Sequence, residues 1–224
     1  MEKKKIVITI DGPSGAGKTT ASRMLARRLG YKYMDTGALY RGIALASKEK
    51  NSHPDDEGAM KSMLAGLTLN LVLKDNSLRL LLNERDVSDL IRTPEISMMA
   101  SAVSALPLVR EYLLEVQRTM GRDKGVVFEG RDMGTVVFPE AEVKFYLDAS
   151  PENRAMRRYR ELDSRGKISL EQVKTEMVKR DFDDSHRKLA PLKQAEGAVR
   201  IDSSNLNLEE VLDIMLYHIE AALC

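Results

Sequence analysis

The residues best suited to chemistry lie near the start of the chain, where positions 12–19 read GPSGAGKT. This run fits the pattern G-x-x-x-x-G-K-[ST], in which backbone N–H groups, a lysine and a hydroxyl surround nucleotide phosphates. We expect Lys18 to reach the β- and γ-phosphates and the Thr19 hydroxyl to bind Mg²⁺. The expected phosphate-binding residues are Gly12, Pro13, Ser14, Gly15, Ala16, Gly17, Lys18, Thr19 and Thr20.

The segments on either side of this run support the interpretation. The β-branched run 5–10 (KIVITI) predicts a buried parallel strand, and residues 19–29 predict a helix that ends at Gly30. Such a strand–loop–helix unit directs backbone N–H groups and a helix N-terminus at an anion. The bare pattern occurs by chance in roughly one chain per hundred of this length, and the two flanking elements make chance much rarer.

Composition excludes several other classes of protein. The 224 residues carry 35 basic and 34 acidic side chains, so no global field favours nucleic acid or a membrane. The single cysteine, Cys224, excludes an internal disulfide framework and indicates a reducing, cytoplasmic location. The first apolar run ends at Asp11, too early for a signal peptide. The three histidines are scattered, which argues against zinc. We expect a monomer.

Strands and helices alternate over most of the chain, which predicts an α/β fold with a parallel sheet flanked by helices. Ser150 is the expected N-cap of one helix, and Asn207 with Glu210 forms the capping-box spacing of the last. The expected strands after the first are 32–35, 125–129, 143–147 and 198–202, with a helix over 37–50.

One segment breaks the alternation. Residues 67–73 alternate as a strand, 74–77 signal a turn, and 78–82 return, which predicts an antiparallel hairpin. We therefore predict a small inserted subdomain at 60–105, with 1–59 and 106–224 forming the core.

Arginine marks a second set of residues, because its planar fork binds phosphate with two hydrogen bonds. Arg131 and Asp132 follow the 125–129 strand at its C-terminal end, where open parallel sheets bind ligands. Arg41, Arg180 and Arg187 also lie at ends of expected elements, although an ordinary surface position explains each of these as well. The guanine-reading stretch Asn-Lys-x-Asp of GTPases is missing from the sequence.

With these residues in view, the chain resembles the bacterial cytidylate (CMP/dCMP) kinases nearly from end to end. The most specific stretch is GRDMGTVVFP. The resemblance rests on residues 8–18 (ITIDGPSGAGK), 35–41 (DTGALYR), 91–95 (IRTPE), 129–139 (EGRDMGTVVFP), 180–187 (RDFDDSHR) and 190–192 (APL).

The resemblance implies a P-loop nucleoside-monophosphate-kinase fold with a monophosphate-binding insert at 60–105 and a helical lid at about 152–168. It implies transfer of the γ-phosphoryl group of MgATP to CMP or dCMP, in pyrimidine nucleotide metabolism. The enzyme would be a phosphotransferase whose acceptor is a phosphate group, with ATP and CMP or dCMP as its partners and Mg²⁺ as its cofactor.

The resemblance also implies roles for individual residues. Arg41, Arg131 and Arg187 would hold the CMP phosphate, and Arg180 and Asp184 its ribose side. Ser101, Arg110 and Asp132 would read cytosine beside Thr36. Lys18, Arg131, Arg187 and Arg157 would be catalytic. Relatives often carry Ser where this chain has Thr36, and Asp183 is an alternative to Asp184.

Elementary chemistry agrees with a carboxylate next to cytosine, and it explains why no residue is needed to remove a proton from the acceptor. Asp132 would accept from the cytosine N4 amino group. Uracil presents an oxygen there, and an unpaired buried polar group costs ~1–3 kcal/mol. A CMP phosphate oxygen is already anionic, so transfer requires positioning and charge stabilisation.

The helix that begins near Ser150 carries four arginines. Closure of this segment would bring them over the phosphates and expel water; a solvated basic helix is the simpler alternative. The four are Arg154, Arg157, Arg158 and Arg160.

Two other functions stay open from the residues. One is a kinase of the same fold acting on UMP, AMP or a small alcohol, where a hydroxyl acceptor would need a carboxylate base. The other is a nucleotide sensor or RNA-binding regulator without turnover, which the near-neutral charge disfavours.

Overall fold

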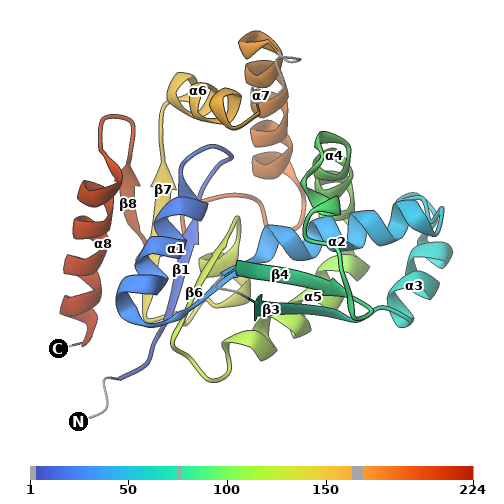
Figure 1. The fold of residues 1–224 in the computed structure, drawn as a ribbon, viewed down its shortest axis with the longest axis horizontal. Coiled ribbons are helices and arrows are strands. Elements are labelled where there is room, and N and C mark those ends of the chain that lie inside the picture. The colour runs from blue at the N-terminus through green and yellow to red at the C-terminus, as the bar shows by residue number, and fades with distance from the viewer. Residues whose placement is uncertain (1–3, 75–76, 163–168, 224) are drawn as a thin grey trace. The chain divides into compact units, whose positions relative to one another are not determined.

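The computed structural model describes residues 4–74, 77–162 and 169–223. It divides into two compact units (Figure 1). The first contains the chain up to Tyr33 and again from Asp123 onward, and the second is the continuous segment Met34–Arg122. Both predicted boundaries of the insert, 60 and 105, fall inside the second unit. The role of 60–105 in binding a monophosphate stays a prediction.

A five-stranded sheet organises the first unit, in the order β2-β6-β1-β7-β8. The central strand β1 pairs in parallel with β6 on one side and β7 on the other, and β7 pairs in parallel with β8. All five residues of β1 are buried, as the β-branched run predicted. The predicted α/β fold with a parallel sheet is confirmed. The strands are β1 (Val7–Asp11), β2 (Lys32–Asp35), β6 (Val126–Gly130), β7 (Val143–Asp148) and β8 (Val199–Asp202).

In the part of the first unit that the structure describes, the α-helices beside this sheet are α1 (Lys18–Leu29), α6 (Pro151–Leu162), α7 (Leu170–His186) and α8 (Leu208–Leu223). Apolar side chains of α1 and α8 share one core with those of β1 and β7, among them Ile8, Leu25, Phe145 and Met215. The expected caps are present. Gly30 ends α1 with a φ of 68°, the Asn153 N–H donates to Ser150 Oγ over 3.2 Å, and Asn207 and Glu210 bond reciprocally.

A short π-helix, η2 (Met133–Val137), follows β6, and no sequence pattern predicted it. Its first two N–H groups, those of Met133 and Gly134, donate to the two carboxylate oxygens of Asp11 over 2.9 and 2.8 Å. Asp11 is the last residue of β1 and is 2% exposed. The end of the central strand therefore fixes the start of the segment that follows Arg131 and Asp132.

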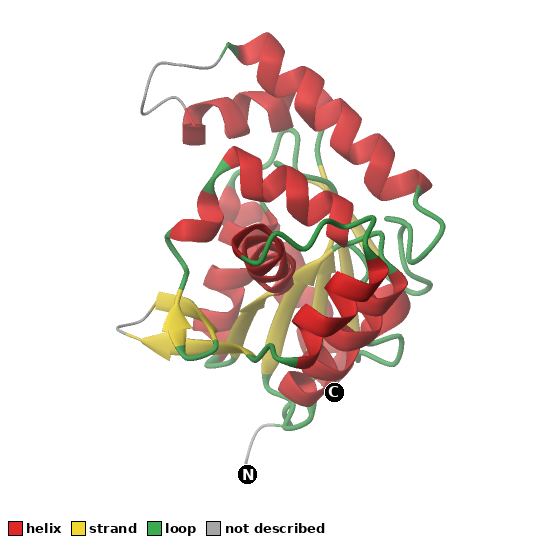
Figure 2. Cartoon of the chain, turned by 90° about the vertical axis from the view of Figure 1, so that its right-hand side faces the viewer, coloured by secondary structure: helices red, strands yellow, loops and turns green. Residues whose placement is uncertain are grey.

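The second unit has its own core, which includes Leu39, Ile43, Met60, Leu80 and Leu113. The predicted hairpin is confirmed, since β3 pairs antiparallel with β4 in the register Leu69↔Leu82; turn positions 75–76 lie outside the described residues. This small sheet is separate from the five-stranded one (Figure 2). The elements are α2 (Thr36–Glu49), α3 (Glu57–Ala65), β3 (Leu69–Lys74), β4 (Ser77–Leu82), β5 (Arg85–Asp86), η1 (Leu90–Arg92), α4 (Pro94–Val103) and α5 (Pro107–Gly121).

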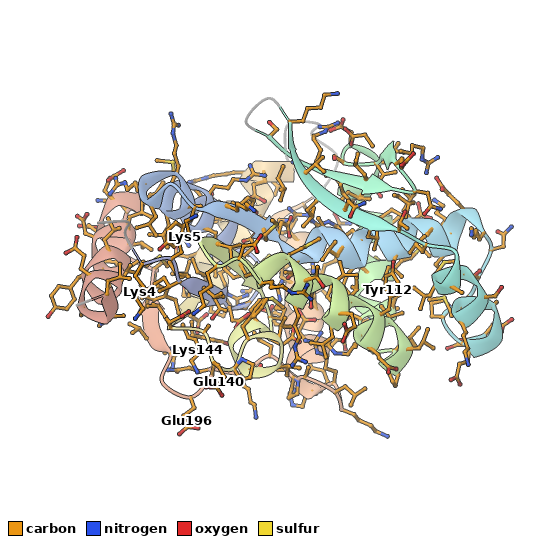
Figure 3. All side chains as sticks on the ribbon, turned by 90° about the horizontal axis from the view of Figure 1, so that it is seen from below. Lys4, Lys5, Tyr112, Glu140, Lys144 and Glu196 are labelled. Carbon is orange, nitrogen blue, oxygen red and sulfur yellow. The ribbon has the colours of Figure 1, made fainter. Side chains whose placement is uncertain are left out.

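Tyr112, labelled in Figure 3, ties α5 to the start of the hairpin, because its hydroxyl donates to the Leu67 carbonyl over 2.7 Å. Across the described parts of the chain, the helices are too short or too polar to cross a membrane.

Candidate active site

The loop between β1 and α1 is shaped by glycine and by the neighbouring strand β7. Gly12 has a φ of 150°, and a Cβ built on it would lie 2.0 Å from the Leu147 carbonyl oxygen. Only glycine allows the chain to leave β1 this close to β7. At the other end of the loop Gly17, with a φ of 90°, precedes the first turn of α1. The glycine loop therefore leads directly into the N-terminus of α1, a position suited to binding an anion.

Lys18 is buried within this loop at 7% exposure, and its Nζ donates to the Pro13 carbonyl over 2.6 Å. Burial lowers the pKa of Lys18 to about 7, and repulsion from Arg131 and Arg180 contributes in the same direction, although Glu129 opposes it. A lysine among cations in a buried site is stabilised by incoming negative charge. The loop is therefore electrostatically prepared for an anion.

Glu129 is a site residue that the sequence reasoning did not single out. It is 4% exposed near the end of β6, and its Oε1 accepts from the Thr19 hydroxyl over 2.9 Å and from the Tyr33 hydroxyl. The signal in the sequence was an acidic residue directly after the apolar run 126–128. A buried carboxylate at the C-terminal end of a strand beside the loop marks the side from which ligands bind.

Three of the expected arginines converge on Asp184 of α7. Its carboxylate lies 3.0 Å from Arg131 Nε and 3.9 Å from both Arg180 Nε and Arg187 Nη1. Burial would raise the pKa of Asp184, but the arginines, Arg131 foremost, lower it below its usual value. Three guanidinium groups around one carboxylate leave net positive charge, which suits a phosphate. Asp183 is exposed, whereas Asp184 is 5% exposed.

Asp132 lies beside this cluster at 2% exposure, with one oxygen 3.5 Å from Arg187 Nη2. The Asp11 carboxylate lies next to it in the chain's fold, because it binds the two N–H groups that follow Asp132. Burial raises the pKa of Asp11 to about 6, the two N–H groups lower it, and Asp132 raises it again. The segment that follows Arg131 and Asp132 is thus held by two hydrogen bonds to the Asp11 carboxyl group.

The other four expected substrate residues belong to the second unit. Thr36 is buried at the start of α2, and Arg41, one turn further, pairs with Asp35 over 2.8 Å. The guanidinium of Arg110 lies 5.8 Å above the Tyr40 ring. Ser101 is half-buried on α4. Helix α2 contacts both α4 and α5, so their elements adjoin within this unit.

Two of the four arginines of α6, Arg154 and Arg157, bind other parts of the fold, whereas Arg160 is exposed. Arg154 is 8% exposed and pairs with Asp181 of α7, while Arg157 bonds to Ser203 over 2.7 and 3.0 Å. Arg158 pairs with Glu161 over 3.0 Å. Residues 163–168 of the expected lid lie outside the described part of the chain.

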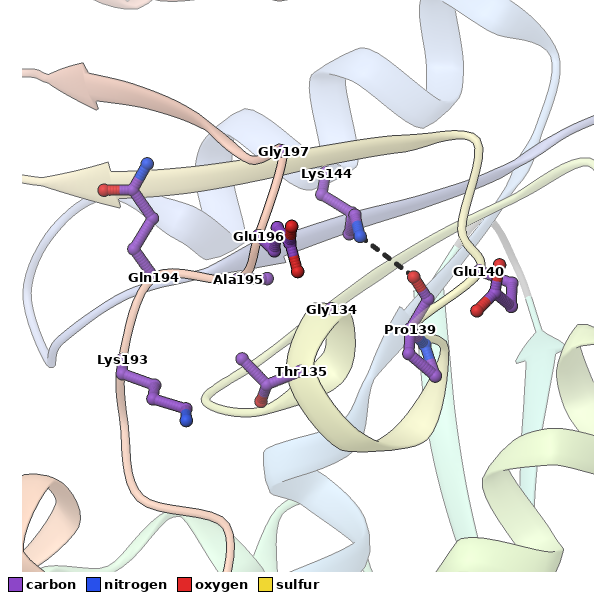
Figure 4. Close-up of a pocket in the computed structure, with 10 residues that line it drawn as sticks. All are labelled: Gly134, Thr135, Pro139, Glu140, Lys144, Lys193, Gln194, Ala195, Glu196 and Gly197. Carbon is purple, nitrogen blue, oxygen red and sulfur yellow. Dashed lines mark hydrogen bonds between the residues drawn. The ribbon is translucent and has the colours of Figure 1, made fainter.

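A separate cavity of about 780 Å³ lies in the first unit, between β7, η2 and the segment 193–197 (Figure 4). Its charged lining residues are Glu140, Lys144, Lys193 and Glu196, and Lys144 donates to the Pro139 carbonyl over 2.9 Å. Two cations and two anions give no net attraction for phosphate. None of the residues expected to bind nucleotide lines this cavity.

Comparisons with known proteins agree with this geometry. A chain from Geobacter sulfurreducens named cytidylate kinase is 48% identical over 214 residues, which cover 95% of this chain and 92% of that protein. A cytidylate kinase from Syntrophotalea carbinolica is 50% identical, covering 95% of this chain and 91% of the relative.

Among solved structures, a shikimate kinase from Bacteroides thetaiotaomicron superposes with a TM-score of 0.50 at 14% identity, over 97% of this chain and 99% of that one, which concerns the fold alone. The sequence-family model described as cytidylate kinase matches residues 8–221. The chain therefore belongs to the cytidylate kinase family.

Proposed function

We propose the following division of labour for the phosphorylation of CMP and dCMP by ATP, which is the activity of this family. The loop from Gly12 to Thr20 binds the ATP phosphates, and Lys18 stabilises negative charge on the transferring group. The observation that carries this assignment is the buried Lys18 within a glycine loop at the N-terminus of α1. Both nucleotides are polyanions, so the cations near Lys18 favour their binding.

The oxygen ligands next to the loop fit Mg²⁺, which prefers oxygen donors and usually accompanies nucleoside phosphates. The Thr19 hydroxyl donates its single proton to Glu129, which leaves the lone pairs of the oxygen available to a cation. When bound, the ion would offset charge on the phosphates. We propose that Thr19 contacts it and that Glu129 orients the Thr19 hydroxyl.

Arg131 and Arg187, held by Asp184, bind the phosphate of CMP in this proposal, together with Arg41 of the second unit. Asp184 fixes the guanidinium groups before the substrate arrives, so less side-chain entropy is lost on binding. Arg180 and Asp184 contribute on the ribose side. This assignment rests on the family resemblance and on the net positive charge of the cluster.

Cytosine recognition is assigned to Asp132, Ser101 and Arg110, with Thr36 beside them. The burial of Asp132 supports its role, because a buried carboxylate discriminates strongly between a donor and an acceptor on the base. Uracil would place an oxygen against it, at a cost of ~1–3 kcal/mol, or roughly 5- to 150-fold in kcat/KM.

Transfer itself needs no protein base, because the attacking oxygen of CMP is already ionised. The protein holds two anions close together, lowers their repulsion with lysine and arginine, and excludes water. The bond from the γ-phosphorus to its bridging oxygen breaks as the bond to the CMP oxygen forms, giving ADP and CDP. We further propose a cytoplasmic monomer that acts in pyrimidine nucleotide metabolism.

The deciding experiment measures ADP formation from MgATP with CMP, dCMP, UMP and AMP in parallel. Rapid turnover of CMP and dCMP with slow UMP supports the Asp132 assignment, and comparable rates for UMP contradict it. Arg131→Ala should abolish CMP phosphorylation while ATP binding survives. Loss of ATP binding in that variant would place Arg131 at the donor instead. Lys18→Ala serves as the inactive control.

A further inference from the structure

The outer side of the phosphate-binding loop is held through its carbonyl groups. Arg154 Nη1 donates to the Ser14 carbonyl over 3.1 Å, and Arg157 Nη1 to the Ala16 carbonyl over 3.4 Å. The hydroxyl of Ser203, which accepts from Arg157, lies 3.2 Å from the same Ala16 oxygen. Two arginines of α6 and one buried serine therefore bind the backbone of the loop.

In a peptide group, the direction of the carbonyl fixes the direction of the N–H of the next residue. In a trans peptide, the C=O of one residue and the N–H of the next point in opposite directions, and the described chain contains no cis peptide bond. The contacts on Ser14 and Ala16 therefore turn the N–H groups of Gly15 and Gly17 toward the inner side of the loop. Both glycines have left-handed φ, 74° and 90°, which is typical of an anion-binding nest.

A third peptide confirms the alternation independently. Pro13 and Ser14 share a peptide whose carbonyl accepts from Lys18 Nζ over 2.6 Å, on the inner side. Its N–H must then point outward, and there it donates to Asp181 Oδ1 over 3.4 Å. Asp181 also pairs with Arg154, so one ion pair binds both the N–H and the carbonyl of Ser14.

Burial and a further hydrogen bond hold the Arg154 side chain in these contacts. Its Nε donates to the Ala149 carbonyl over 3.0 Å, and the residue is 8% exposed. A Cβ on Gly15 would lie 2.7 Å from the Arg154 carbonyl oxygen, so the helix backbone and the loop are in direct contact. Turning this guanidinium toward a phosphate would break its bonds to Ala149, Ser14 and Asp181 together.

We infer that Arg154, Arg157 and Ser203 are positioning residues that direct the Gly15 and Gly17 N–H groups at the nucleotide phosphates by binding the loop carbonyls from outside. They act through the loop and not by contact with phosphate, in contrast to the closing arginines that the sequence suggested. The role rests on the proposed binding of ATP phosphates by this loop.

The sharpest test is Ser203→Ala in the full chain, because it removes the hydroxyl contact with the Ala16 carbonyl without changing any charge. It also removes the contact of the same hydroxyl with the Asp148 carbonyl, over 3.0 Å, and its bond from Arg157. Ser204→Ala is the matched control, since the Ser204 hydroxyl bonds to Asp202 and to the Ser150 N–H and not to the loop. The dissociation constant of MgADP is measured by calorimetry, and the Gly15 and Gly17 amide resonances are followed by NMR during the titration.

We expect Ser203→Ala to raise the MgADP dissociation constant about fivefold, the equivalent of one ordinary hydrogen bond. The Gly17 amide shift should shrink while the Gly15 shift persists, and KM for CMP should not change. Ser204→Ala should stay within about twofold of the wild type. A wild-type dissociation constant and Gly17 shift in Ser203→Ala would overturn the inference.

Arg154→Lys provides a second test if Ser203→Ala does not fold. Lysine keeps the positive charge but lacks the planar guanidinium group that donates several hydrogen bonds at once. A positioning role predicts weaker MgADP binding and a diminished Gly15 shift. Unchanged binding in Arg154→Lys, with loss only in Arg154→Met, would show that charge alone matters and would contradict the role. Absence of CMP turnover in a wild type that still binds MgADP would refute the proposed acceptor without affecting this test.

Discussion

Asp11 should make stability depend on pH in a way that asparagine at the same position cannot. Its carboxylate is 2% exposed, and burial raises its pKa from 3.8 to about 6. The folded state therefore binds more protons than the unfolded state between these values, and stability falls as pH rises through this window. The shift is about 2 pKa units, or about 3 kcal/mol in all at 1.36 kcal/mol per unit.

Most of that range lies at a pH where other carboxylates also titrate, so the measurement is a difference between two proteins. Urea unfolding of the wild type and of Asp11→Asn is compared from pH 5 to pH 8. A pKa of about 6 leaves about 1.4 kcal/mol of the effect within this interval. The free energy of unfolding of Asp11→Asn relative to that of the wild type should therefore rise by about 1.4 kcal/mol from pH 5 to pH 8, whatever the absolute stability of the variant.

A pH-independent difference between the two proteins would refute the reasoning, because it would mean that the Met133 and Gly134 N–H groups fully compensate the buried charge. A lowered pKa of Asp11 in the folded state would also leave no pH dependence between pH 5 and pH 8, because the carboxyl group would then be ionised in both states. Titration of the Asp11 carboxyl carbon by NMR checks the assignment directly.

Three further outcomes are expected. Asp184→Asn leaves the guanidinium groups around it without their counter-ion and should lower kcat/KM for CMP roughly 10- to 150-fold. Asp183→Asn is the comparison at an exposed position. A larger loss of kcat/KM in Asp183→Asn than in Asp184→Asn would assign the role to Asp183. Glu129→Gln weakens the hydrogen bond from the Thr19 hydroxyl and should raise the Mg²⁺ concentration for half-maximal activity about fivefold. An unchanged Mg²⁺ dependence would show that Glu129 has no role in binding the ion. Gly12→Ala places a Cβ 2.0 Å from the Leu147 oxygen and should prevent folding, whereas Gly66→Ala, with open space around it, should fold normally. Soluble yield and thermal unfolding distinguish the two variants. A stable Gly12→Ala protein would contradict the close approach of β1 and β7.

Local patterns in the sequence predicted the elements whose causes are local. The β-branched run before the glycine loop became β1, the alternating leucines became an antiparallel hairpin, and the capping residues Ser150 and Asn207 accept the expected N–H bonds. Each of these depends on residues within a few positions of one another, so composition and spacing suffice.

Features that depend on distant partners could not be predicted in this way. The π-helix at Met133–Val137 begins where Asp11, more than a hundred residues earlier, accepts two N–H bonds. Arg154 reads as one of several arginines on a basic helix, and only the fold places it against Ser14. Glu129 resembles any acid after a strand until Thr19 is seen beside it. The roles assigned to the substrate-binding residues stay predictions.

The interrupted first unit has a consequence for the order in which the protein assembles during its synthesis. The partners of β1 are β6 and β7, whose residues Val126 and Val143 emerge more than a hundred residues after Val7. At about 5–20 residues per second this delay is on the order of ten seconds. The continuous second unit, with its own core, can fold on the ribosome in that time, while the apolar strand VITID waits without its neighbours. The nascent chain is therefore most exposed to aggregation at the strand that later leads into the phosphate-binding loop.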